Sequence, residues 1–443
     1  MNPLLKTIYE LSDREIAQYS DNVMLGGGTR GGPVLVRGKG VRVFDRGGND
    51  YIDCTSQSWA MYLGFVNPEI NAIVAEHMEN MSHIHQGFDS LPRFYLAKRL
   101  TDLAPRAINR VSFTVGGGPA IEAAMKIGYK NTQPSRDFIC LNDGYHGTTL
   151  GTMGASWIST RAGGRLMGGS RFLGMTRSFI RVPQPYCYRC PIGLTYGSCS
   201  IACANVLEST IERGIAGNAA GFIVEPLQAS GGQIIYPREY MQRIREICDV
   251  YSVPLIFDEI QTFARIGHFF ASEYYGVDPD MIVLGKGLGA GFPIAALLIS
   301  DKLDGSEPDS EELHTFANNS VSQVAAAKQL ELLENGVLEN CRCMGEYLKK
   351  GLEYLRREFP EMGDIRQAGL HIGIELVRDP ETKEPLTDEG REVRRAGFKH
   401  GLILGLSGPR PNILKVKPPL IIKKDECDEI LDKLSRSMHS VLR

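Results

Sequence analysis

The segment DPDMIVLGKGLGAGFP, residues 278–293, is the strongest indication of the fold of this chain. Within it, an apolar run at 281–284 comes directly before a glycine-rich turn that carries a single lysine, Lys286. A second apolar run, 253–257, ends in Asp258. Short apolar runs bounded by turn residues are typical of the buried strands of a parallel sheet. Each strand would therefore deliver a charged side chain to the carboxyl edge of the sheet, where such folds bind their ligands.

Lys286 and Asp258 both need a partner if they are buried, because an unpaired charge is costly to bury. A lysine in a surface loop and an aspartate that caps a helix would need no further explanation. A cofactor that forms a Schiff base with the lysine and presents a protonated ring nitrogen to the aspartate would remove both costs. Pyridoxal phosphate is that cofactor. The neighbouring motifs favour this second interpretation.

Length and composition limit the class of protein. The 443 residues exceed one ordinary core, so two or more domains are expected. The net charge of -3, without a basic stripe, argues against nucleic acid or an anionic membrane as a partner. The first 20 residues are not expected to form a signal peptide, and no apolar run is long enough to span a bilayer. Ten cysteines in such a chain predict reduced thiols and a cytoplasmic location.

The order of predicted elements indicates an α/β fold. Residues 1–55, read as an amphipathic helix, a glycine-rich loop and a β-meander, are expected to pack with a small domain. From about residue 110 the chain alternates strand and helix. Residues 56–305 are therefore expected to form a large domain with a mostly parallel central sheet flanked by helices. Residues 306–443, with long helices and a pair of strands, complete the smaller α+β domain.

Two further motifs follow predicted strands and so reach the same edge of the sheet. Gly117 and Gly118 lie between a predicted strand and a helix, where backbone N–H groups and the helix dipole could bind a phosphate, although a structural turn explains such glycines equally well. Tyr145 and His146 follow the next strand, where an aromatic ring could stack on a flat cofactor or simply pack against a helix. Gln261 could reach the phenolic oxygen of a pyridoxal ring. A nucleotide site is not favoured, because both the Walker lysine and the GxGxxG pattern are missing.

A cysteine cluster stands apart from these motifs. Cys187, Cys190, Cys199 and Cys203 form the pattern C-x2-C-x8-C-x3-C, and the first pair has the spacing of metal ligands. The segment between the pairs is shorter than in common zinc fingers. Reduced, buried thiols are therefore favoured over a metal site, and no metal ligand is assigned.

With these residues in place, the chain resembles the class III aminotransferases, pyridoxal-phosphate enzymes of fold type I, over nearly its whole length. The segments that carry the resemblance are FIVEPLQASGG, LIFDEIQTFARIG and DMIVLGKGLGAGFPIAAL. The resemblance implies an enzyme that moves an amino group from an amine or amino acid to a 2-oxo acid. It also implies a homodimer with shared active sites, with pairing of dimers into tetramers left open.

The resemblance implies a role for each candidate residue. Lys286 matches the catalytic Schiff-base lysine, and Asp258 matches the partner of the ring nitrogen. The remaining residues expected to bind the cofactor are Gly117, Gly118, Tyr145, His146, Glu225, Gln261 and Thr315. Among them, Thr315 matches a threonine that reaches the phosphate in the neighbouring subunit. Ser58 and Trp59 fall where substrate contacts come from the N-terminal segment.

The chain departs from the family pattern near its substrate side. Many members carry an arginine before the PPL element that grips an α-carboxylate with two N–H groups. This chain has Lys415 at that position, with Lys417 nearby. A similar lysine pair occurs in the phospho-lyase branch, so an amine that bears a phosphate or phosphonate becomes a candidate substrate.

Other reactions on the same cofactor stay open. An ammonia- or phospho-lyase, a decarboxylase and a racemase differ from an aminotransferase in the bond that breaks. That bond is selected by the groups around the substrate, for which the candidates are Ser58, Trp59, Arg265 and Lys415. A catalytically inactive relative is disfavoured, because Lys286, Asp258 and Gln261 are all present.

Overall fold

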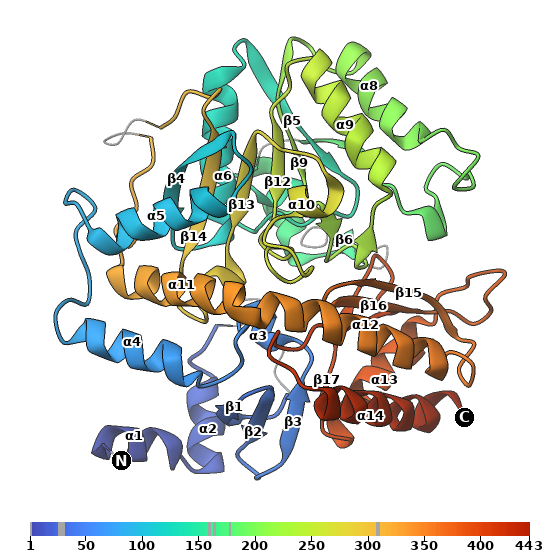
Figure 1. Ribbon diagram of the computed structural model, residues 1–443. Helices are drawn as coiled ribbons and strands as arrows, with labels where there is room; N and C mark the ends of the chain where they lie inside the picture. The colour runs from blue at the N-terminus through green and yellow to red at the C-terminus, as the bar shows by residue number, and fades with distance from the viewer. Residues whose placement is uncertain (1, 25–31, 158–160, 163–164, 177–178, 307–310) are drawn as a thin grey trace.

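The computed structural model describes residues 2–24, 32–157, 161–162, 165–176, 179–306 and 311–443. In Figure 1 a large sheet with its helices occupies the upper half of the molecule, and the N-terminal strands and C-terminal helices occupy the lower half. Both ends of the chain lie in the lower half. The described structure is therefore the predicted α/β fold with a large and a smaller domain.

The large domain is built on a seven-stranded sheet with the order β4-β14-β13-β12-β9-β5-β8. Its strands are β4 (Ile108–Thr114), β5 (Ser135–Leu141), β8 (Phe179–Val182), β9 (Asn218–Val224), β12 (Leu255–Asp258), β13 (Met281–Leu284) and β14 (Ala295–Ser300). Neighbouring strands run parallel except for β14, which is antiparallel to both β13 and β4. The segment 285–294 between β13 and β14 is too short for a helical crossover, so β14 has to run antiparallel.

Helices cover both faces of this sheet, and successive strand residues alternate between two apolar cores. Ile256 packs in the core formed with α6 (Gly117–Asn131). Leu255 and Phe257 pack in the opposite core with α8 (Ala202–Arg213) and α9 (Arg238–Val250). This alternation follows from the two-residue repeat of a strand. Because both faces of the sheet are covered by apolar cores, polar side chains are placed at the ends of the strands.

The smaller domain contains two four-stranded sheets. One has the order β15-β16-β19-β18 and is antiparallel throughout. In the other, with the order β1-β2-β3-β17, the N-terminal meander joins the C-terminal part of the chain through the parallel pair β3 and β17. Their bounds are β15 (Met362–Ala368), β16 (His371–Leu376), β18 (Gly405–Ser407), β19 (Ile413–Val416), β1 (Leu35–Lys39), β2 (Arg42–Asp45), β3 (Asp50–Asp53) and β17 (Leu402–Ile403).

Other helices connect and cover these sheets. They are α3 (Ser56–Trp59), α4 (Pro68–Met78), α5 (Leu91–Leu103), α10 (Ala271–Tyr275), α11 (Ser320–Leu332), α12 (Leu338–Leu355), α13 (Thr387–Lys399) and α14 (Lys424–Leu442). The single helix predicted at the N-terminus is instead two, α1 (Pro3–Tyr9) and α2 (Asp13–Ser20), because Ser12 and Glu15 form a capping box that starts a new helix. Most of the predicted glycine-rich loop at 21–32 lies outside the described residues.

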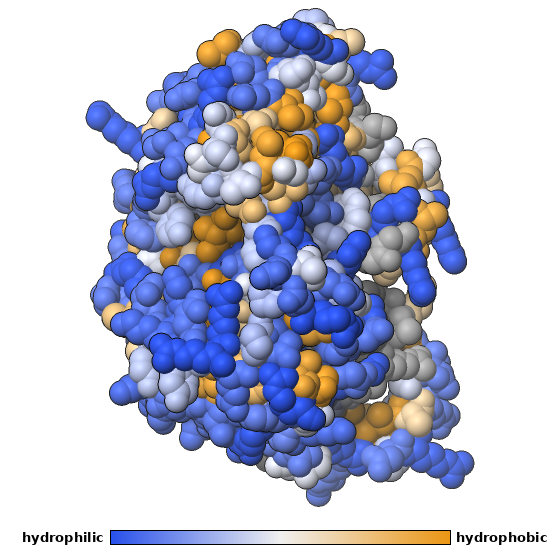
Figure 2. Space-filling model, turned by 90° about the vertical axis from the view of Figure 1, so that its right-hand side faces the viewer, coloured by the Kyte–Doolittle hydropathy of each residue, from blue (hydrophilic) through white to orange (hydrophobic). Residues whose placement is uncertain are grey.

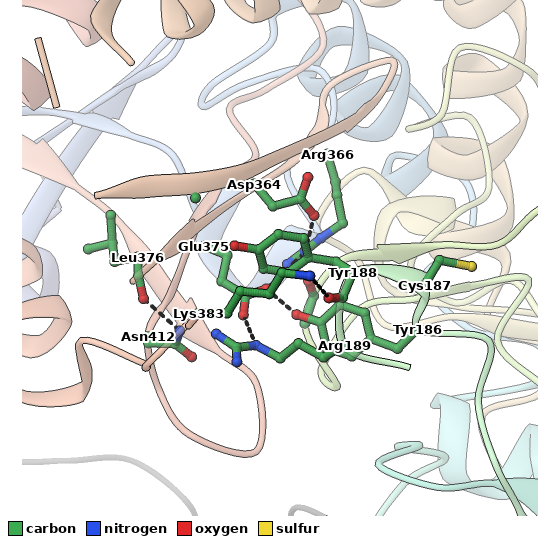
Figure 3. Close-up of polar contacts among 12 residues, drawn as sticks. Tyr186, Cys187, Tyr188, Arg189, Asp364, Arg366, Glu375, Leu376, Lys383 and Asn412 are labelled. Atoms are coloured by element: carbon green, nitrogen blue, oxygen red, sulfur yellow. Dashed lines mark hydrogen bonds and ion pairs between the residues drawn. The ribbon is translucent and has the colours of Figure 1, made fainter. Parts of the chain in front are cut away.

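A buried polar cluster ties the cysteine-containing segment to the smaller domain (Figure 3). Glu375 of β16 accepts hydrogen bonds from the Tyr186 hydroxyl, from Arg189 Nε and from Arg366 Nη1, the last at 2.9 Å. The Cys187 side chain points away from this cluster. The segment that follows β8 is therefore held to the smaller domain by charge-assisted bonds to Glu375 of β16.

The surface is mixed in character. Figure 2 shows a largely hydrophilic face on which apolar side chains gather in a patch in the upper half. None of the helices in the described part of the chain combines the length and the apolar character that a membrane crossing needs.

Candidate active site

A cavity of about 300 Å³ opens where β9, β12 and β13 end. It is lined by the predicted cofactor residues of the large domain, which are Gly117, Gly118, Tyr145, His146, Glu225, Asp258, Gln261 and Lys286. The parallel order of the strands brings these residues together, because their carboxyl ends meet at one edge of the sheet.

Lys286 is the one lysine of this cavity. It follows β13 with a φ of +43°, and only part of its surface is exposed. Burial lowers the pKa of its amine, while the carboxylates of Asp258 and Glu225 act in the opposite direction. The next residue, Gly287, tolerates no side chain, because a Cβ there would lie 2.2 Å from the Tyr62 ring. The turn that presents the lysine is therefore held by close packing.

Asp258 is the last residue of β12 and is buried. Its Oδ2 lies 2.7 Å from His146 Nδ1, and its Oδ1 accepts the backbone N–H of Ile260 at 3.2 Å. The backbone N–H of His146 in turn donates to Ser156 Oγ at 2.8 Å. The carboxylate is thus oriented from two sides, as a group that keeps a ring nitrogen protonated must be.

Glu225 follows β9 and holds the loop that carries Tyr145. Its Oε1 accepts the backbone N–H of Tyr145 and its Oε2 that of Ala229, each at 3.0 Å. Burial raises the pKa of Glu225, and nearby His146 lowers it. The two N–H donors also stabilise the carboxylate form, so Glu225 acts as an anchor for the wall of the cavity.

The start of α6 also lines the cavity. Gly116 caps this helix without a side-chain hydrogen bond, so the first N–H groups remain available to a ligand. A Cβ at Gly117 would lie 2.5 Å from Ile260 Cδ1, and one at Gly118 would lie 3.0 Å from Thr149 Cγ2. The glycines keep the backbone open where a phosphate would approach it.

Lys415 and Trp59 lie together, although neither lines the 300 Å³ cavity. Lys415 Nζ is 4.3 Å from the centroid of the Trp59 ring, a cation–π distance. Trp59 ends a run of four residues with positive φ, 56–59, of which Ser58 is exposed. Burial lowers the pKa of Lys415 to about 7, and Lys286 acts in the same direction. No carboxylate among the described residues forms an ion pair with Lys415.

Two predicted residues lie elsewhere. Arg265 is fully buried and donates to the carbonyls of Leu370 and Pro418 and to Ser56 Oγ, at 3.2, 2.7 and 3.2 Å. Its guanidinium therefore supports the turn beneath Trp59 instead of facing the cavity. Thr315 is exposed and does not line the cavity in this single chain.

Lys417 contacts the site without having been predicted as part of it. It is fully buried, and its Nζ donates to Gln261 Oε1 at 3.1 Å. The two-residue spacing of Lys415 and Lys417 predicts that their side chains point to the same side, since side chains two apart in a strand share a face. No sequence signal identifies Gln261 as the partner.

These residues fit pyridoxal phosphate. The volume lies within the range of small-ligand pockets. An amine of lowered pKa, a buried carboxylate oriented by a histidine, and a glycine-lined helix start match the carbonyl, ring nitrogen and phosphate of the cofactor.

The four clustered cysteines border one separate small cavity, together with Tyr240. All ten cysteines are free. Among the described residues, no group of three or more His, Cys, Asp or Glu side chains is arranged to hold a metal ion. Burial raises the pKa of Cys203 to about 11, so this thiol stays protonated near neutral pH.

Comparison with known proteins agrees with this geometry. The model of the family Aminotransferase class-III matches residues 29–438. Leucine/methionine racemase of Thermococcus litoralis is 31% identical over 92% of this chain and 91% of its own. Adenosylmethionine-8-amino-7-oxononanoate aminotransferase of Geobacter sulfurreducens is 33% identical over 92% of both chains. The PLP-bound amine transaminase of an uncultivated Pseudomonas species superposes with a TM-score of 0.84, at 26% identity over 95% of this chain and 98% of its own. The chain therefore belongs to the class III aminotransferases, enzymes that transfer amino groups with pyridoxal phosphate.

Proposed function

We propose that this aminotransferase takes its amino group from an amine or amino acid that carries an oxyanion and delivers it to a 2-oxo acid, with Lys286 as the catalytic lysine. The observation that carries the proposal is the convergence of Lys286, Asp258 and Gln261 on one cavity at the end of the central sheet. Pyridoxal phosphate bound there supplies a carbonyl that condenses with amines and a ring that withdraws electrons.

Each side chain has a separate task in this proposal. The Lys286 amine would hold the cofactor covalently and, when an amino substrate binds, would act as the general base and acid that moves a proton at the substrate carbon. The lowered pKa of the amine favours its uncharged form, which is the form that accepts a proton. Asp258 keeps the ring nitrogen protonated, and His146 keeps Asp258 in place. Gly117 and Gly118 bind the phosphate through their backbone.

Lys415 is the proposed contact for the oxyanion of the substrate. It is buried, has no carboxylate partner among the described residues and stands over the Trp59 ring. A buried cation without a partner is costly, and an incoming carboxylate, sulfonate or phosphonate would supply the missing charge. Because lysine offers a point charge rather than a planar fork, it leaves the geometry of that anion open.

A homodimer with shared active sites is part of the proposal. Thr315 would reach the phosphate bound by the partner subunit. Large apolar side chains on the same chain are exposed, among them Phe88, Leu91 and Phe316. A hollow of about 850 Å³ lies beside them, between the 85–93 and 312–317 segments. Exposed apolar side chains around a hollow are typical of a subunit interface. The ten free cysteines support a cytoplasmic location.

An amino-acid racemase is the second candidate. It is favoured by one observation, the 31% identity to a protein named Leucine/methionine racemase over nearly the whole chain. A racemase would move the same proton from the substrate carbon and return it to the opposite face, without loss of the amino group.

Half-reactions of the holoenzyme distinguish these functions. The purified protein is mixed with single amines in the absence of any 2-oxo acid, and the visible absorption band of the cofactor is followed. The panel holds β-alanine, 4-aminobutyrate, L- and D-amino acids, taurine and 2-aminoethylphosphonate, with propylamine as a neutral control. Stoichiometric loss of the band establishes amino transfer. Inversion of an amino acid with the band regenerated would establish the racemase, and release of ammonia, phosphate or carbon dioxide would establish a lyase or decarboxylase.

A further inference from the structure

The main chain of Lys417 is held on both sides. Its backbone N–H donates to the Cys54 carbonyl at 2.9 Å, and its own carbonyl accepts the Ser56 hydroxyl at 2.7 Å. Lys417 directly follows β19, the strand of Lys415, and its side chain is fully buried. The start of this side chain is therefore fixed before its amine makes any contact.

The amine of Lys417 donates a hydrogen bond to an amide oxygen and not to a carboxylate. Its Nζ lies 3.1 Å from Gln261 Oε1 and 5.1 Å from the centroid of the Trp59 ring. In the part of the chain that the structure describes, no acidic side chain forms an ion pair with it. Burial lowers the pKa of Lys417. The positive charges of Arg265, Lys415 and Lys286 lower it further, whereas the negative charge of Glu225 raises it. Such a placement is costly, so a role beyond stability needs to be considered.

The contact determines which way the Gln261 amide faces. An ammonium has three donors and no acceptor, and even a neutral amine offers N–H donors. The atom of Gln261 that faces Lys417 is therefore its oxygen, and its NH₂ group has to lie on the other side. Gln261 is buried and lines the 300 Å³ cavity beside Lys286. Among the described residues, its Nε2 donates to no protein atom.

We propose that Lys417 is a positioning residue that fixes the Gln261 side chain with its NH₂ donors facing the cofactor cavity. The inference rests on the proposed function, because the group that accepts these N–H donors is an oxygen of the bound pyridoxal phosphate. Among the described residues, Lys417 is the one protein donor to Gln261 Oε1. Without it, the side chain can turn its oxygen toward the cavity and repel that acceptor. Lys417 thereby acts through Gln261 and touches no reacting atom.

A double-mutant cycle tests this route. Lys417→Met and Gln261→Leu are each expected to raise the dissociation constant of pyridoxal phosphate about 10-fold, the loss of one good hydrogen bond. The double variant should exceed the larger single effect by no more than about 3-fold, since the two residues act as one unit. Both single variants should also raise the midpoint of the pH titration of the visible cofactor band, because an N–H donor favours the deprotonated form of a neighbouring group. Additive effects in the double variant would overturn the proposal.

A second variant leaves the buried lysine untouched. Gln261→Glu keeps an oxygen on Lys417 but removes the NH₂ group, so it should lose at least as much cofactor affinity as Gln261→Leu. Wild-type affinity in Gln261→Glu would also overturn the proposal. Lys433→Met is the matched control, since Lys433 is a buried lysine that donates to the Gly401 carbonyl at 3.0 Å, away from the site. It should lower the melting temperature without moving the cofactor band. Failure of every form, wild type included, to bind pyridoxal phosphate would count against the proposed function itself.

Discussion

Nδ1 of His146 lies 2.7 Å from Oδ2 of Asp258, and both side chains are buried. The contact joins the loop after β5 to the end of β12, two strands that flank β9 on either side. The position of the carboxylate thus depends on the order of strands in the sheet. A site built on strand ends is more rigid than one built on surface loops alone.

Asp258→Asn should lower the rate of the half-reaction about 10²-fold to 10³-fold, the usual effect of losing one preorganised electrostatic group. The substitution keeps the shape of the side chain and removes the negative charge proposed to keep the ring nitrogen protonated. Single-turnover kinetics with saturating cofactor would measure the change. An unchanged rate in a variant that still holds the cofactor would contradict the role given to Asp258.

Lys286→Ala should abolish the covalent attachment of the cofactor and lower the rate by at least about 10²-fold to 10⁴-fold, the range for a lost general base. Because the native lysine already has a φ of +43°, alanine adds little backbone strain. Mass spectrometry after borohydride reduction reports the attachment, and thermal melting reports the fold. Reduced cofactor found on a different lysine of the wild-type protein would refute the assignment.

Gly117→Ala should weaken cofactor binding by about 10-fold, because its Cβ would lie 2.5 Å from Ile260 Cδ1 and displace the end of a side chain that lines the cavity. Gly116→Ala is the matched control, since its Cβ would meet nothing closer than 4.0 Å. Equilibrium titration of both apo-proteins with pyridoxal phosphate gives the comparison. Equal affinities would mean that the start of α6 does not approach the phosphate.

Shared active sites predict complementation between two inactive variants. Lys286→Ala removes the lysine of a subunit's own site, and Thr315→Asp places a negative charge against the phosphate of the partner's site. A mixed dimer then has one site with both defects and one with none. Random assembly of equal amounts should restore about one quarter of wild-type activity. Activity no higher than that of the separate variants would show that Thr315 does not serve the partner.

The buried amine of Lys415 should make the free energy of unfolding depend on pH between its folded and unfolded pKa values. Burial lowers its folded pKa from 10.5 to about 7, so between these values the unfolded chain holds a proton that the folded chain lacks. The free energy of unfolding therefore rises with pH across this window, and the penalty is full below about pH 7. Lys415→Met removes the penalty, so its stabilising effect should be larger at pH 7 than at pH 10. Urea unfolding of the apo-protein at both values measures the difference, and a pH-independent effect would contradict the burial of a titrating amine.

Much of the cofactor site can be predicted without a structure. Lys286 and Asp258 each follow an apolar run, and buried strands place such residues at one edge. The glycines at the start of α6 and the polar residues after β5 obey the same rule. Arg265 shows where local reasoning stops, since its partners Leu370 and Pro418 are 105 and 153 positions away along the chain. The break between α1 and α2 could have been found from the Ser12 and Glu15 spacing alone.

Local sequence sets the strands, the turn that carries Lys286 and the glycines at the start of α6, because periodicity and turn chemistry act between neighbours. Which side chains meet across those elements depends on how the whole chain packs. Lys417 reaches Gln261 across 156 positions, and His146 reaches Asp258 across 112. Such pairs form when the strands assemble in their particular order and bury the polar groups together. Burial then sets their charge and hydrogen bonding, which a linear pattern does not contain.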